Sequence, residues 1–251
     1  MNTFKTMLKI EGKLSVRDMN MVIFAIAMPV VILVILGVIY GQKPAYAGAD
    51  YTFLEQSFGA LCSVAICAGG LMGLPIMISE YRERKILKRF QVTPISPLMI
   101  LFVHLCIYTL YAAASVVSLW ALAKLFWGFR MKGSLLLFTA GWLLVLVSIL
   151  SIGVLVGGVA KNSKDASVIA SVLYFPMLVF SGATLPYEVM PEMMQKVVDV
   201  MPLTQGIKIL KAATLGLPLT NVGLSVIVML VLAVLCIFFR SNFSDGSKVF
   251  F

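Results

Sequence analysis

The chain has 251 residues, of which 61% are hydrophobic and 12% are charged, and its formal net charge is +9. So few polar side chains cannot cover the surface of a water-soluble domain, which excludes an ordinary soluble protein. The positive charge does not indicate nucleic-acid binding, because the cations lie in short segments between long apolar runs, where membrane topology and anionic lipids account for them.

The first predicted element, within residues 1–19, is an amphipathic helix on the membrane surface. A basic amphipathic helix beside a membrane span is typical of the membrane interface. An equally good interpretation is a positive flank that only sets the orientation of the first span. Four cations recur every four residues and would share one helix face: Lys5, Lys9, Lys13 and Arg17. Much of another face is apolar, at Phe4, Met7, Leu8 and Leu14.

Six apolar segments follow, each long enough to cross the hydrocarbon core of a bilayer as a helix. Helices are expected because lipid offers no partner for an unpaired backbone group. The predicted fold class is therefore an all-α integral membrane protein with one transmembrane domain, residues 1–251. The predicted spans are residues 20–41, 56–79, 98–123, 134–160, 166–184 and 220–239.

Residues 80–97 are the one dense charged stretch between two apolar segments. They predict an amphipathic helix, on which side chains four positions apart share a face. Such a helix could dock in a cleft of a soluble partner, with ion pairs setting its register. The alternative is a loop whose charges only set the topology. The candidate contact residues are Glu80, Tyr81, Arg82, Glu83, Arg84, Lys85, Ile86, Leu87, Lys88, Arg89, Phe90, Thr93 and Pro94.

The segment 181–215 is too apolar for a free loop, yet prolines interrupt it. Proline removes a backbone donor and crowds the preceding turn, so a single long helix is excluded. We expect two short helices, at about 188–199 and 203–215, that form a re-entrant hairpin from about residue 185 and part of an outer gate. The three prolines are Pro186, Pro191 and Pro202.

The Lys and Arg residues favour a cytoplasmic N-terminus. In that orientation 13 of the 20 cations lie on the inner side of the membrane, in agreement with the positive-inside rule. Both termini and the charged stretch at 80–97 would then be cytoplasmic, and the hairpin would lie outside.

Two stretches of the chain resemble signature sequences of the ABC type-2 exporter permeases. In the charged stretch, the matches to the family's coupling helix are Arg82-Glu83, Leu87, Arg89 and Thr93-Pro94-Ile95-Ser96, while Lys85-Ile86 replaces the usual Gly-Thr. After the fifth span, the matches are Ser181, Gly182, Pro186, Pro191, Pro202, Leu203 and Thr204. Six spans, a surface helix and the chain length also fit, so the resemblance covers essentially the whole chain.

The resemblance implies a transporter subunit with no catalytic residue, cofactor or metal of its own. Two copies, or one copy and a related permease, would form the path across the cytoplasmic membrane of a bacterium. Two cytoplasmic ATPase subunits would bind ATP and Mg²⁺ and drive outward movement of an amphiphilic drug, antibiotic or lipid. The alternatives are export of a lipid-linked glycan and, outside this family, a secondary transporter or a membrane scaffold.

The substrate path should be apolar, because the predicted spans carry almost no charge. Methionine side chains adapt to varied shapes, and aromatic side chains offer large apolar surfaces. Each candidate could instead belong to the core or face lipid. The candidates are Phe24, Phe58, Met72, Met77, Phe175, Met177 and Phe180.

His104 is the only histidine of the chain and lies in the third predicted span. An ionisable group in a membrane suggests a function. The spans hold no carboxylate that could relay protons with it, so we expect a neutral histidine satisfied by a neighbouring helix. One histidine and four scattered cysteines predict no metal site.

Glycines recur every four residues in two spans, at Gly69 and Gly73 and at Gly153 and Gly157. This spacing lets helices approach closely. We expect packing within one subunit, with a role at a subunit interface as the alternative.

Overall fold

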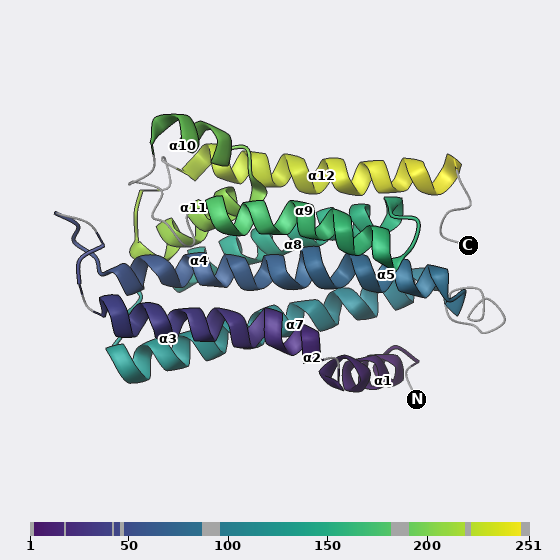
Figure 1. Ribbon diagram of the computed structural model, residues 1–251, viewed down its shortest axis with the longest axis horizontal. Helices are drawn as coiled ribbons and strands as arrows, with labels where there is room; N and C mark the ends of the chain where they lie inside the picture. The colour runs from purple at the N-terminus through teal and green to yellow at the C-terminus, as the bar shows by residue number, and fades with distance from the viewer. Residues whose placement is uncertain are drawn as a thin grey trace.

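The computed structural model describes residues 3–17, 19–41, 43–45, 48–86, 96–181, 191–218 and 222–246. Long helices lie side by side in a bundle (Figure 1). In chain order the helices are α1 (Thr3–Arg17), α2 (Met19–Val22), η1 (Ile23–Ala27), α3 (Met28–Tyr40), α4 (Phe53–Cys67), η2 (Ala68–Gly73), α5 (Leu74–Glu83), α7 (Pro97–Trp127), α8 (Leu135–Val159), α9 (Ser163–Phe180), α10 (Glu192–Val198), α11 (Pro202–Leu215) and α12 (Gly223–Gly246).

Five of the six predicted spans are confirmed as helices long and apolar enough to cross a membrane. They are Ile23–Tyr40, Phe53–Glu83, Leu98–Trp127, Leu135–Val159 and Ser163–Phe180. The sixth prediction falls on α12, whose apolar part, Gly223–Phe238, is shorter than the others.

Two of the long helices contain a π-helical segment just before a proline. η1 is followed by Met28 and Pro29, and η2 by Leu74 and Pro75. Proline has no N–H to donate, and its ring crowds the carbonyl of the preceding turn. The wider π turn accommodates the ring without ending the helix. η1 and α3 therefore continue as one rod, and so do α4, η2 and α5.

The helix made of α4, η2 and α5 is the buried centre of the bundle, with neighbours on several sides. Helix α8 packs against it through glycines. A Cβ on Gly153 would collide with the carbonyl oxygen of Gly70, and one on Gly157 would lie 2.9 Å from Cβ of Ile78. The close approach predicted for Gly153 and Gly157 is confirmed. On the central helix, the residue in close contact with α8 is Gly70 rather than Gly69. A Cβ on Gly69 would make only an ordinary van der Waals contact.

Two short helices follow the fifth span, as predicted. α10 begins after Pro191, and α11 begins at Pro202. Proline is well suited to the first position of a helix, because an N–H there would have no partner within the helix. α11 is largely buried between α4, α8 and α12. The backbone N–H groups of Lys132 and Gly133 donate to the carbonyl of Thr214, which fastens the end of α11 to the α7–α8 connection. The position of this pair of helices in the membrane stays a prediction.

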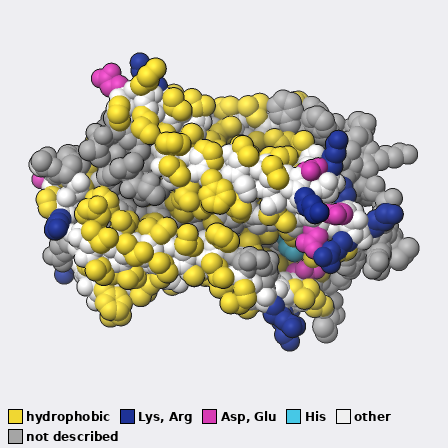
Figure 2. Space-filling model, in the orientation of Figure 1, with side chains coloured by type: hydrophobic (Ala, Val, Ile, Leu, Met, Phe, Trp, Pro, Cys, Tyr) yellow, Lys and Arg dark blue, Asp and Glu magenta, His cyan; other side chains and the backbone are white. Residues whose placement is uncertain are grey.

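α1 and the last turns of α12 lie at one end of the bundle, together with the end of α5, and α10 and α11 lie at the other (Figure 1). The face drawn in Figure 2 is covered mostly by hydrophobic side chains. Lys, Arg, Asp and Glu side chains gather at the end that holds α1 and the end of α5 (Figure 2). An apolar belt with charged ends is what a bilayer-spanning bundle requires.

Helix α1 has the predicted basic face, with Lys5, Lys9, Lys13 and Arg17 all exposed. Its opposite face packs on α7, but the buried residues are Met7 and Glu11. Leu14, predicted to be on the apolar face, is exposed. A carboxylate therefore points from α1 into the bundle.

Candidate functional site

The last turn of α5 binds the end of α8. Ser79 donates its hydroxyl to the carbonyl of Gly157 at 3.2 Å. Arg82 donates from Nη1 to the carbonyl of Gly158 at 2.9 Å and from Nη2 to that of Ala160. The last carbonyls of a helix have no partner within it, and a cation there also complements the helix dipole. Arg82 satisfies both requirements for α8.

The neighbouring residue, Glu83, binds the start of α9. Its Oε2 accepts hydrogen bonds from the backbone N–H of Ser163 at 3.0 Å and from the hydroxyl of Ser163 at 2.7 Å. A carboxylate is favourable at a helix N-terminus, where N–H groups lack partners. The turn between α8 and α9 is short and polar, with Asn162 capping α9 by accepting from the N–H of Asp165. Arg82 and Glu83 thus hold the two sides of one turn with opposite charges.

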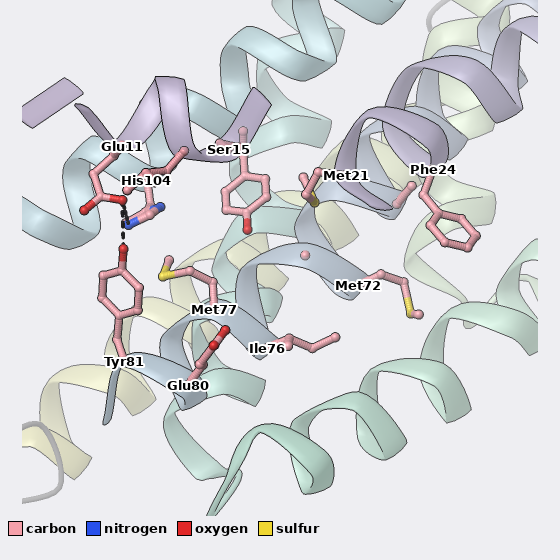
Figure 3. A pocket seen from close by; sticks show the side chains of 14 residues that line it. Glu11, Ser15, Met21, Phe24, Met72, Ile76, Met77, Glu80, Tyr81 and His104 are labelled. Carbon is pink, nitrogen blue, oxygen red and sulfur yellow. Dashed lines mark hydrogen bonds and ion pairs between the residues drawn. The ribbon is translucent and has the colours of Figure 1, made fainter. Parts of the chain in front are cut away.

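Tyr81 joins the same end of α5 to α1. Its hydroxyl donates to Oε2 of Glu11 at 2.8 Å. The His104 ring of α7 meets the Tyr81 ring edge-on with centroids 5.2 Å apart, and His104 Nε2 lies 3.7 Å from the same Glu11 oxygen (Figure 3). The carboxylate beside His104 comes from α1, outside the predicted spans. The expectation that a neighbouring helix satisfies His104 is not met at Nε2, which has no hydrogen-bond partner among the described residues.

Glu11 was not among the predicted site residues, although the sequence holds a signal for it. Glu11 is the one acidic residue in Thr3–Arg17, and it lies four positions after Met7, on the face that packs against the bundle. A lone carboxylate on the buried face of a basic helix indicates a specific partner.

Ser79, Tyr81, Arg82 and Glu83 together form what we call the α5 junction. Their side chains connect the end of one central helix to three other elements, namely α1, α8 and α9. Force applied to this end of α5 would act on all three elements at once. Among the described residues no group of His, Cys, Asp or Glu could hold a metal ion.

The predicted coupling helix is interrupted at Arg84 and Lys85, and Ile86 is again helical. α5 ends at Glu83, Arg84 and Lys85 form a turn, and the Lys85 φ of 54° is left-handed. A non-glycine residue rarely adopts this conformation, and it stops an α-helix. Glu80 pairs with Arg84 at 2.7 Å on the surface. Ile86 is half-buried, and Leu87, Lys88, Arg89, Phe90, Thr93 and Pro94 lie outside the described residues.

The predicted outer-gate residues that the structure describes lie at the opposite end of the bundle. Ser181 ends α9, and Pro191 caps α10. Leu203 and Thr204 are buried in the first turn of α11. Gly182 and Pro186 lie outside the described residues.

The candidate path residues do not form one surface. Phe24, Met72 and Met77 line one cavity beside Tyr81. Phe58 is fully buried in the core, stacked on Phe129 with ring centroids 4.6 Å apart. Three lie on α9, where Met177 is buried and Phe175 and Phe180 are exposed.

Comparison with known proteins agrees with this architecture. A family model described as ABC-2 type transporter matches residues 2–215. The inner membrane transport permease YhhJ of Escherichia coli (strain K12) is 29% identical over 132 residues, and the permease of the same name from Shigella flexneri matches equally. The aligned segment covers 52% of this chain but only 35% of those relatives. Because the family model covers most of its length, the chain belongs to the ABC-2 type transporter family.

Proposed function

We propose that this chain is the permease subunit of an ABC exporter and that a separate cytoplasmic ATPase drives it from the end of α5. The observation that carries the proposal is the α5 junction, which links one charged helix end to α1, α8 and α9. A loop needed only for topology has no reason to bind three other elements through oriented side chains.

The proposed mechanism uses α5 as a lever. Closure of two ATPase subunits on ATP would press on the turn at Arg84 and Lys85 and on the chain that follows. Arg82 and Glu83 would pass this movement to the α8–α9 turn, and Tyr81 would pass it to α1. Because α4, η2 and α5 continue as one rod, the push would tilt the centre of the bundle rather than be absorbed near the membrane surface.

The family and the composition support an apolar cargo. The helices that span the bundle are nearly free of charge along their length. We therefore propose that an amphiphilic drug, antibiotic or lipid moves outward. Both termini would be cytoplasmic, and two permease chains, identical or related, would complete the path.

Reversal of one exposed charge at the proposed docking end should weaken ATPase binding. Lys85 is exposed in the turn that ends α5. A repulsive pair at an interface costs enough to reduce affinity about tenfold or more, so Lys85→Glu should reduce recovery of the ATPase with the tagged permease by about that factor. The measurement is copurification with the proposed partner ATPase.

Lys196 provides the matched control, because it is an exposed lysine of α10 at the opposite end of the bundle. Lys196→Glu should leave recovery unchanged. Equal recovery of the ATPase with both variants and the original chain would refute docking at the end of α5.

A further inference from the structure

A cavity of about 440 Å³ opens beside the α5 junction, at the end of the bundle that holds α1. Its walls come from α1, α2, η1, η2, α5 and α7. The volume is within the range of small-molecule sites in proteins. In Figure 3, Glu11, His104 and Tyr81 lie at one side of the cavity, Met21, Met72 and Phe24 lie at the other, and Met77 lies between the two groups.

The polar side of the cavity consists of Glu11, Tyr81 and His104. Glu11 is 9% exposed and accepts a hydrogen bond from Tyr81. A carboxylate has room for about four such bonds, so the one donor found among the described residues leaves most of its capacity unused. A buried carboxylate without a cationic partner is unfavourable, and a positive group beside it would remove that penalty.

His104 supplies a second, independent observation. Its side chain is only 7% exposed, and among the described residues Nε2 has no hydrogen-bond partner. The 3.7 Å between Nε2 and the Glu11 carboxylate is too long for a direct hydrogen bond. An ammonium group on the cavity side can donate to both atoms at once, because it carries several N–H groups.

The rest of the lining suits the apolar body of the same ligand. Met21, Met72 and Met77 are flexible and polarisable, and Phe24 and Tyr108 offer aromatic surface. Aromatic faces also attract cations. The described residues that line the cavity include two glutamates and no lysine or arginine. Glu80 is already paired with Arg84, so Glu11 is the carboxylate that remains for a ligand.

We propose that this cavity binds an amphiphilic organic amine in its charged ammonium form, with Glu11 and His104 around the ammonium group and the methionine side around the apolar body. The inference rests on the proposed function, because it names the substrate class and the place where the substrate first enters. The ligand would touch Tyr81, which belongs to the α5 junction. Ligand binding would therefore act on the same helix end on which the ATPase is proposed to press.

Binding of a fluorescent amine tests the proposal without any ATPase. The full-length permease is placed in nanodiscs of neutral phosphatidylcholine, and monodansylcadaverine, an amphiphilic primary amine, is titrated against empty discs. The N-acetyl derivative of the same probe has the same body without the charge. We expect the amine to bind and the acetylated probe to bind about tenfold or more weakly, since a buried charge partner is lost.

Glu11→Gln removes the charge but keeps an oxygen for the Tyr81 hydroxyl, so the variant should fold. It should weaken amine binding about tenfold or more and leave binding of the acetylated probe unchanged. Glu192→Gln, at an exposed acid of α10, should bind the amine as the original chain does. Met77→Trp should weaken binding of both probes, because the larger ring fills the apolar side.

Three results would overturn the proposal: equal binding of the two probes, unchanged amine binding in Glu11→Gln, or unchanged binding in Met77→Trp. Equal binding of the two probes, or unchanged amine binding in Glu11→Gln, would mean that Glu11 and His104 contact water rather than the ammonium group. Because none of these titrations contains the ATPase, failure here is distinct from failure of the copurification that tests the proposed function.

Discussion

Gly153→Ala should sharply reduce the amount of folded permease. The added Cβ would collide with the carbonyl oxygen of Gly70, which is backbone of the central helix and cannot rotate away as a side chain could. Overpacking of a close contact costs about 1–3 kcal/mol or more. The two helices would have to separate, and the contact of Gly157 with Pro75 and Ile78 lies one turn along the same interface. The measurement is the midpoint of thermal unfolding, together with the yield of monodisperse protein.

The chain carries its own reporters for this measurement. Cys62 and Cys67 are buried and free, so a thiol-reactive dye labels them as the bundle opens. Gly223→Ala is the matched control, because nothing lies within 4 Å of the position of its Cβ. It adds the same methyl group and should leave the midpoint unchanged. If Gly153→Ala unfolds at the same temperature as Gly223→Ala, the close packing of α8 on the central helix is refuted.

Arg82→Ala should destabilise the end of the bundle that holds the α5 junction and uncouple the proposed transport from ATP hydrolysis. The substitution removes the donors to the carbonyls of Gly158 and Ala160 at the end of α8. Hydrogen bonds from a charged donor contribute about 1.5–3 kcal/mol each, so the loss in a partly exposed place is about 2–4 kcal/mol. We expect a lower unfolding midpoint and, in the assembled transporter, ATP hydrolysis that no longer responds to substrate.

Arg84→Ala is a close control for stability, two residues further along. Arg84 forms a surface pair with Glu80, and a pair of this kind contributes less than about 1 kcal/mol. Its removal should leave the unfolding midpoint of the isolated permease almost unchanged. An Arg84→Ala variant that is as unstable as Arg82→Ala would show that charge at this end matters, rather than the bonds of Arg82 to α8.

Much of the helical architecture follows from the sequence because its signals are local. Five spans were predicted from the length of their apolar runs, and the helices α10 and α11 from prolines in apolar sequence. The basic face of α1 followed from a four-residue spacing. Each of these signals lies within one segment, so a single sequence reveals it.

The details of the candidate site depend on contacts between segments. The charged stretch was recognised, but nothing in it indicated that Arg82 and Glu83 bind the α8–α9 turn of the same chain. The end of α5 was missed because neither glycine nor proline marks the left-handed Lys85. Glu11 stands out as the one acidic residue of α1, but its partners, Tyr81 and His104, lie far along the chain and do not follow from that local signal. Likewise, glycine spacing indicated close packing but not that Gly70 faces Gly153.

The most direct test of the account is ATP hydrolysis by the reassembled transporter. The chain and its proposed partner ATPase are purified together, placed in proteoliposomes, and assayed with and without monodansylcadaverine. The account predicts a stable complex whose hydrolysis the amine stimulates, and stimulation that Arg82→Ala abolishes while the complex persists. Two results would contradict the account. In the first, the ATPase does not associate with the permease. In the second, ATP hydrolysis by the complex is the same with and without the amine.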